Sequence, residues 1–152
     1  MSLLERVREL FQRQKPLAKD AKGEPADLEI KAAAAVLLLE AAFGDEEYVW
    51  REEHVLVRGL ERAFGIGRKE TRELLGRADE IRPPVVKLSD VTDLLARSYD
   101  LEQRKQILAL VWQVIEADET VERWEAVFAA HVTQALGLTT AQGDEVRATA
   151  RR

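Results

Sequence analysis

Hydrophobic positions follow a helical period along most of the chain. Residues 28–43 are apolar on nearly every side, and residues 32–43 are interrupted by Glu40 alone, which predicts a helix enclosed by other helices. Residues 50–64 and 121–136 carry apolar side chains at three- and four-residue spacing, the pattern of amphipathic helices. No strand-like alternation bounded by hairpin turns occurs. The pattern therefore predicts an all-α fold.

Glycine and proline indicate where the helices of the first half end. Gly65 and Gly67 follow the helix over 50–64, and a glycine adopts positive φ at a helix end at little cost. A short charged helix over 68–78 then ends before Pro83 and Pro84, whose rings exclude helix continuation.

Capping residues indicate where the helices of the second half begin. Ser89 is predicted to be the N-cap of a helix through Leu95. Asp100 with Gln103 resembles a capping box for the next helix, and Thr139 suggests a further cap before a last helix toward residue 150. Together the elements predict a single bundle of about seven or eight helices.

An acidic motif occurs twice at one offset in the sequence. Asp45 ends an apolar helical run and Glu52 stands seven residues later, and Asp118 and Glu125 repeat this arrangement. Self-similarity at one offset indicates a duplicated supersecondary unit. We therefore expect an internal pseudo-twofold in the bundle, with both acidic turns at the same end.

The first 27 residues differ from the rest of the chain. Residues 2–14 place Leu3, Val7 and Leu10 on one helical face among charged residues, which predicts an amphipathic helix. Packing on the body is the simpler interpretation, and weak contact with a membrane surface or a partner is the alternative. Residues 15–27 form a predicted loop, so we divide the chain into an N-terminal helix and linker (1–27) and a helical domain (28–152).

Composition narrows the classes of function. The chain has 152 residues, of which 46% are hydrophobic and 34% charged, as in one folded domain. It has no Cys and two His, which excludes thiolate sites and disfavours His-rich metal sites. A net charge of −5 argues against a nucleic-acid partner. With no signal peptide or bilayer-length apolar run, a cytoplasmic location is expected.

The repeated carboxylates form the candidate site. If Asp45, Glu52, Asp118 and Glu125 meet, their mutual repulsion favours a neutralising cation, and oxygen ligands suit Ca²⁺ or Mg²⁺. In the alternative interpretation the aspartates accept hydrogen bonds from free amides at turns. The glutamates then interact with the positive end of a helix dipole, for about 0.3–1 kcal/mol each.

Other chemistry has little support in the sequence. The ladder of an EF-hand loop is missing, and no phosphate loop, nucleophile elbow or catalytic triad spacing is visible. His54 and His131 do not occupy matching places in the repeat, so both are expected to be surface or packed residues. The three tryptophans are expected to pack in the core or at its rim: Trp50, Trp112 and Trp124. We assign no catalytic residue.

The two copies resemble the TerB-like tellurite-resistance family over about residues 30–140. The resemblance rests on the following segments: 40–45 with Tyr48 and Glu52, 64–66, 99–104, Ala117 and Asp118 with Val121 and Glu125, and 136–138. The family pattern is Ala-Asp-Gly in each half, followed by an apolar residue and a Glu. In this chain Gly44 replaces the first Ala, and Glu46 and Glu119 replace both Gly residues.

The resemblance implies an all-helical duplicated fold and a role in tellurite or stress response, with divalent-cation binding suspected. It implies no reaction. The leading hypothesis is a non-enzymatic module that binds a divalent cation or a protein partner through its acidic turns. The alternatives are a metal-dependent enzyme of unknown substrate and a membrane-peripheral adaptor that uses residues 2–14. The signal, the partner and the oligomeric state stay open.

Overall fold

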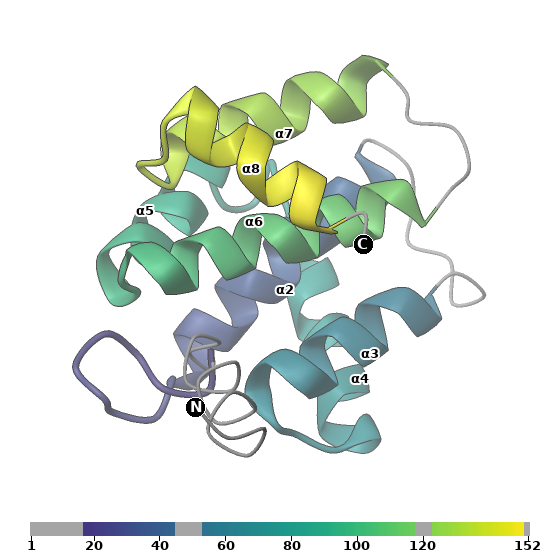
Figure 1. The fold of residues 1–152 in the computed structure, drawn as a ribbon. Coiled ribbons are helices and arrows are strands. Elements are labelled where there is room, and N and C mark those ends of the chain that lie inside the picture. The colour runs from purple at the N-terminus through teal and green to yellow at the C-terminus, as the bar shows by residue number, and fades with distance from the viewer. Residues whose placement is uncertain (1–16, 45–52, 118–122, 151–152) are drawn as a thin grey trace, which may run out of the picture.

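The computed structural model describes residues 17–44, 53–117 and 123–150. These ranges form seven α-helices (Figure 1). Their bounds are α2 (Leu28–Phe43), α3 (Glu53–Phe64), α4 (Arg68–Ile81), α5 (Leu88–Ser98), α6 (Leu101–Glu116), α7 (Arg123–Ala135) and α8 (Thr140–Ala150). An isolated bridge between Lys19 and Pro25 is the only strand-like pairing in these ranges. The predicted all-α fold is confirmed.

Helix α2 lies in the middle of the molecule, as the apolar pattern predicts. The Asp27 carboxylate caps its first turn by accepting a hydrogen bond from the Ile30 amide at 2.9 Å. Ten of its 16 residues are buried, and α4, α5 and α6 pack around it. A helix with apolar side chains on all sides is stable only when it is surrounded in this way.

Helix α6 is the second central element. Its capping box is confirmed, because the Asp100 carboxylate accepts from the Gln103 amide and the Gln103 side chain accepts from the Asp100 amide. Its apolar side is fully buried at Leu108, Val111 and Ile115. Helices α7 and α8 cover this helix, and a further box at Thr139 precedes α8.

Each central helix packs against the helices that follow it. Helix α2 contacts α3 and α4, whereas α6 contacts α7 and α8, and cross-contacts join α2 to α7 and α3 to α6. A duplicated unit would produce this arrangement, but α5 has no counterpart among the helices described. The internal duplication therefore stays a prediction.

Three local predictions are corrected. Ser89 is not an N-cap, because α5 begins at Leu88 and the Asp90 and Val91 amides donate to the carbonyl of Lys87, which holds the cap position. Gly67 does not end a helix but precedes α4 with extended backbone at φ −79°. Helix α4 also continues to Ile81, beyond the predicted residue 78. The predicted positive φ is confirmed at Gly65, at +64°.

The loop before α2 is attached to the junction of α5 and α6. The buried Tyr99 hydroxyl donates a hydrogen bond to the Leu17 carbonyl at 2.7 Å, and the Gln103 amide side chain donates to the Lys19 carbonyl at 2.7 Å. Burial, with Asp20 and Asp27 nearby, raises the pKa of Tyr99 well above its ordinary value, so the hydroxyl stays protonated as a donor. The predicted helix over 2–14 lies outside the described residues.

Within the part of the chain that the structure describes, no helix is both long and apolar enough to cross a membrane.

Candidate functional site

The C-terminal end of α2 adjoins the first of the two acidic turns. Helix α2 ends at the buried Phe43, and Gly44 follows with φ +55° and ψ −118°. The Gly44 amide still donates a hydrogen bond to the Glu40 carbonyl at 2.9 Å. The backbone conformation at Gly44 is one that side chains with a Cβ rarely adopt. The turn after α2 therefore begins at a position that requires glycine.

Arg82 connects the end of α4 to this end of α2. Its Nε donates to the Glu40 carboxylate at 2.8 Å, and its Nη2 donates to the Gly44 carbonyl at 2.7 Å. The guanidinium also lies 6.0 Å from the centre of the Phe43 ring. Only 10% of the Arg82 side chain and 14% of the Glu40 side chain are exposed, so this ion pair is largely screened from water.

Local sequence explains why Arg82 reaches α2. The two prolines that follow it end α4, and Arg82 itself has extended backbone at ψ 156°. The Val85 amide then donates to the Arg82 carbonyl at 3.0 Å, which closes a turn over Pro83 and Pro84. Since α4 packs along α2, a side chain at the end of α4 lies beside the end of α2.

The first turn of α7 also contacts the end of α2. A Cβ built on Gly44 would lie 3.1 Å from two ring carbons of Trp124, closer than an ordinary contact. The indole is therefore packed directly on the Gly44 backbone. Two features thus explain why glycine stands at position 44: the backbone has a positive φ, and an aromatic ring packs closely against it.

Glu125 is the next residue after Trp124 and is the described member of the candidate carboxylate set. It is 5% exposed and lies in the first turn of α7. A carboxylate there interacts favourably with the positive end of the helix dipole. A buried carboxylate also requires a compensating partner, and Glu125 is not without one.

The other predicted ligands, Asp45, Glu52 and Asp118, lie outside the described residues, as do Glu46 and Glu119. The described ranges contain no group of three or more His, Asp or Glu side chains that could hold a metal ion. Glu125 is therefore the one predicted ligand with a known position, and the grouping of all four stays a prediction.

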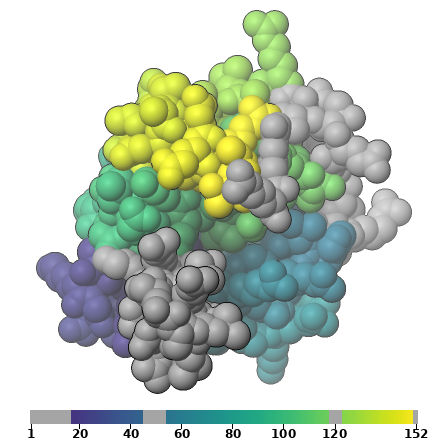
Figure 2. All heavy atoms as spheres, in the orientation of Figure 1, coloured from purple at the N-terminus to yellow at the C-terminus, as the bar shows by residue number. Residues whose placement is uncertain are grey.

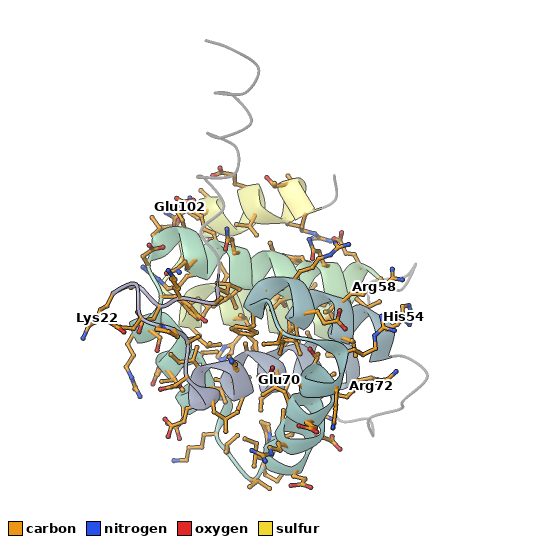
Figure 3. All side chains as sticks on the ribbon, turned by 90° about the horizontal axis from the view of Figure 1, so that it is seen from below. Lys22, His54, Arg58, Glu70, Arg72 and Glu102 are labelled. Atoms are coloured by element: carbon orange, nitrogen blue, oxygen red, sulfur yellow. The ribbon has the colours of Figure 1, made fainter. Side chains whose placement is uncertain are left out.

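Histidines and tryptophans occupy different environments. His54 is exposed on α3, one turn before Arg58 (Figure 3), and His131 is exposed on α7, which agrees with their prediction as surface or packed residues. Trp112 is a core residue at 6% exposure, whereas Trp124 is 42% exposed at the rim. Trp50 lies outside the described residues.

Sequence reasoning missed the role of Arg82 and its partner Glu40. In the sequence, Glu40 stands out as an interruption of an apolar run and as part of the family resemblance, whereas nothing singles out Arg82. A charge within the apolar part of a helix that is buried on all sides is a signal that an opposite charge lies nearby. That signal could have predicted a basic partner for Glu40, although not which residue supplies it.

The end of α6 has a related but more open arrangement. Arg147 of α8 donates from Nε to the Glu116 carboxylate at 3.3 Å, and its guanidinium lies 4.1 Å from the centre of the Trp112 ring. The Arg147 side chain is 34% exposed and that of Glu116 is 19% exposed. Near the end of each central helix, a glutamate of that helix thus pairs with an arginine from another segment.

Comparisons with known proteins agree with the fold. A crystal structure of a protein of unknown function from Porphyromonas gingivalis W83 superposes with a TM-score of 0.61 at 20% identity. The match covers 82% of this chain and 97% of that one, and at this identity it shows the fold alone. No protein of curated function matches the chain.

The family comparison is more specific. A family model described as "Tellurite resistance protein TerB" matches residues 31–148, which is most of the chain. The matched region begins in α2, ends in α8 and includes both acidic turns. The chain therefore belongs to the TerB tellurite-resistance family.

Proposed function

We propose that this chain is a non-enzymatic tellurite- or stress-response module that binds a divalent cation at the end of the bundle where α2 ends and α7 begins. The observation that carries the proposal is the packing of Trp124 on Gly44. Asp45 follows Gly44 and Glu125 follows Trp124, so one residue from each acidic motif is next in the sequence to a residue of this contact. Membership of the TerB family supports the proposed role in tellurite or stress response.

The donor chemistry favours a hard cation. The four candidate ligands, Asp45, Glu52, Asp118 and Glu125, supply carboxylate oxygens only. Oxygen ligands suit Ca²⁺ and Mg²⁺, whereas softer metals prefer imidazole or thiolate. Arg82, which lies at this end of α2, already donates to Glu40 and to the Gly44 carbonyl. These hydrogen bonds fit a role for Arg82 in holding the end of α2 in place.

Thermal unfolding with EDTA, Ca²⁺, Mg²⁺ and Mn²⁺ tests the proposal. A cation present at about 100 times its dissociation constant should stabilise the fold by about 2.7 kcal/mol. An Asp45→Asn/Asp118→Asn variant should lose this stabilisation. The matched control is Asp90→Asn/Asp93→Asn, which removes two exposed carboxylates of α5 and should keep it.

The variant Glu125→Gln distinguishes a cation site from the alternative in which Glu125 interacts only with the dipole of α7. Glutamine keeps a hydrogen-bonding side chain but loses the charge. If Glu125 is a ligand, the variant should lose cation-dependent stabilisation, whereas a dipole interaction alone changes stability by about 0.3–1 kcal/mol without changing the cation response. An unchanged wild-type midpoint with every cation would show that the proposal is wrong.

A further inference from the structure

The outward face of α7 has no charge beyond its first residue. Residues 126–143 contain no Lys, Arg, Asp or Glu, although 34% of the whole chain is charged. The exposed side chains of α7 are Arg123, Trp124, Val127, Ala130, His131 and Gln134. They recur every three or four residues and therefore share one face of the helix. We call this set the α7 face.

The α7 face differs from other exposed surfaces of the molecule. Trp124 and Val127 are 42% and 63% exposed and lie within one turn of each other. Helix α4, by comparison, exposes charged side chains along its length, among them Arg68, Lys69 and Glu73. Figures 1 and 2 show α7 at the upper edge of the molecule, with no labelled helix above it. In such a chain, an exposed helix face that carries apolar side chains and no charge beyond its first residue is typical of an interface.

The charges of the chain indicate what covers this face. Two copies with a net charge of −5 each repel one another, and they approach at least cost where neither presents a carboxylate. A basic partner would find no carboxylate on the α7 face, and an acidic partner or anionic membrane would find only Arg123. A second copy of the chain presents the same carboxylate-free face, so the two faces meet without needing an opposite charge on either side.

We propose that the α7 face pairs with the α7 face of a second copy, antiparallel about a twofold axis beside Val127. A twofold interface uses the same patch on both subunits, so the patch must be complementary to itself. With the axis between Val127 and Phe128, Trp124 of one copy lies opposite His131 of the other, at both ends of the contact. Val127, a 63% exposed apolar side chain of the face, then lies at the centre.

The size of the face sets the strength of this contact. Residues 123–134 extend for about 18 Å along the helix axis. One helix face of this length buries less than the roughly 800 Å² per partner of a standard stable interface. The dimer is therefore weak, and it forms and dissociates with protein concentration.

Sedimentation velocity of the full chain tests the proposal between about 10 µM and about 1 mM, where small interfaces associate. The wild type should shift from monomer toward dimer over this range. Val127→Asp places two like charges across the axis and should weaken dimerisation by more than about tenfold. The matched control is Val85→Asp, at an even more exposed valine beyond α4, and it should dimerise like the wild type.

Disulfide trapping gives a second measurement that does not depend on dimer strength. Because the chain has no Cys, a Val127→Cys variant can form a disulfide only between copies. The geometry requires Cα atoms about 4–7 Å apart, which a twofold beside residue 127 provides. Mild oxidation should give a covalent dimer with Val127→Cys and little with Val85→Cys, and circular dichroism should show both variants folded.

Several outcomes would contradict the dimer. A wild type that stays monomeric over the whole concentration range would do so, as would equal trapping of the two cysteine variants. A Leu10→Cys/Val127→Cys variant that forms an internal disulfide in a monomer would show instead that residues 2–14 of the same chain cover the face. A variant Val127→Asp that dimerises like the wild type would place the interface elsewhere.

Discussion

The ends of α2 and α6 are each held by an arginine, but the two arginines are in different environments. Arg82 makes hydrogen bonds of 2.8 Å and 2.7 Å to a carboxylate and a carbonyl and is 10% exposed. Arg147 makes a longer contact of 3.3 Å to Glu116, is 34% exposed and stacks on Trp112. The first is an ion pair removed from water, and the second is a surface contact.

This difference follows from how the two helices end. Helix α2 ends in a glycine with positive φ, which turns the Gly44 carbonyl toward Arg82 and leaves space for Trp124. Helix α6 ends at Ala117 with ordinary helical backbone at φ −64°. The end of α2 is thus the more tightly determined of the two, and it borders the candidate cation site. The comparison yields four predictions.

Arg82→Met should have the largest effect. It leaves the Glu40 carboxylate and the Gly44 carbonyl without their donor in a part of the molecule with little access to water. Removing one partner of such an ion pair costs about 3–5 kcal/mol. Chemical denaturation measures the change. The double variant Glu40→Gln/Arg82→Met should cost less than the sum of the single variants, and additive effects would contradict the coupling.

Gly44→Ala should destabilise the protein by about 1–3 kcal/mol, because the methyl group meets both a positive φ and the Trp124 ring. Gly76→Ala is the matched control. Gly76 lies inside α4, and a Cβ there would have no neighbour within 4 Å. That substitution should stabilise the protein by about 0.5–1 kcal/mol through helix propensity. Equal effects at both glycines would show that Gly44 has no special conformation.

Arg147→Met should cost only about 1 kcal/mol, because the ion pair with Glu116 is partly exposed and the stacking on Trp112 is modest. Arg147→Lys should recover part of the loss by keeping the charge without the planar stacking group. Thermal unfolding of both variants measures this. A loss as large as that of Arg82→Met would remove the contrast between the two helix ends.

Added salt should have the smallest of the four effects, and it should weaken one ion pair more than the other. At about 0.5 M NaCl exposed charges are screened, whereas largely buried pairs are screened much less. The coupling free energy from a Glu116/Arg147 double-mutant cycle should therefore fall with added salt, while that of the Glu40/Arg82 cycle should change little. Parallel changes in the two cycles would show equal access to solvent.

Much of the fold was predictable from local patterns. The bounds of α2 agree with the apolar run over 28–43, and the capping box at Asp100 and Gln103 is present as predicted. Such features depend on residues a few positions apart. The prediction of Ser89 as a cap was wrong, because α5 begins at Leu88 and the Asp90 and Val91 amides donate to the Lys87 carbonyl instead.

The candidate site was less predictable. The repeat identified Glu125, and the structure places it buried in the first turn of α7. The contacts around it join residues far apart in the sequence: Arg82 with Glu40, and Trp124 with Gly44. No spacing rule connects these pairs, because their distance depends on how whole helices pack.

Sequence alone was sufficient for the all-α class, the caps at Asp100 and Thr139, the family and the acidic repeat, since each follows from the order and spacing of residues along the chain. Only the tertiary structure decided which arginine meets Glu40, why glycine is required at position 44, and which helix face is left apolar at the surface. Those features arise from packing between distant segments, where one side chain's environment is set by residues that local chemistry does not specify.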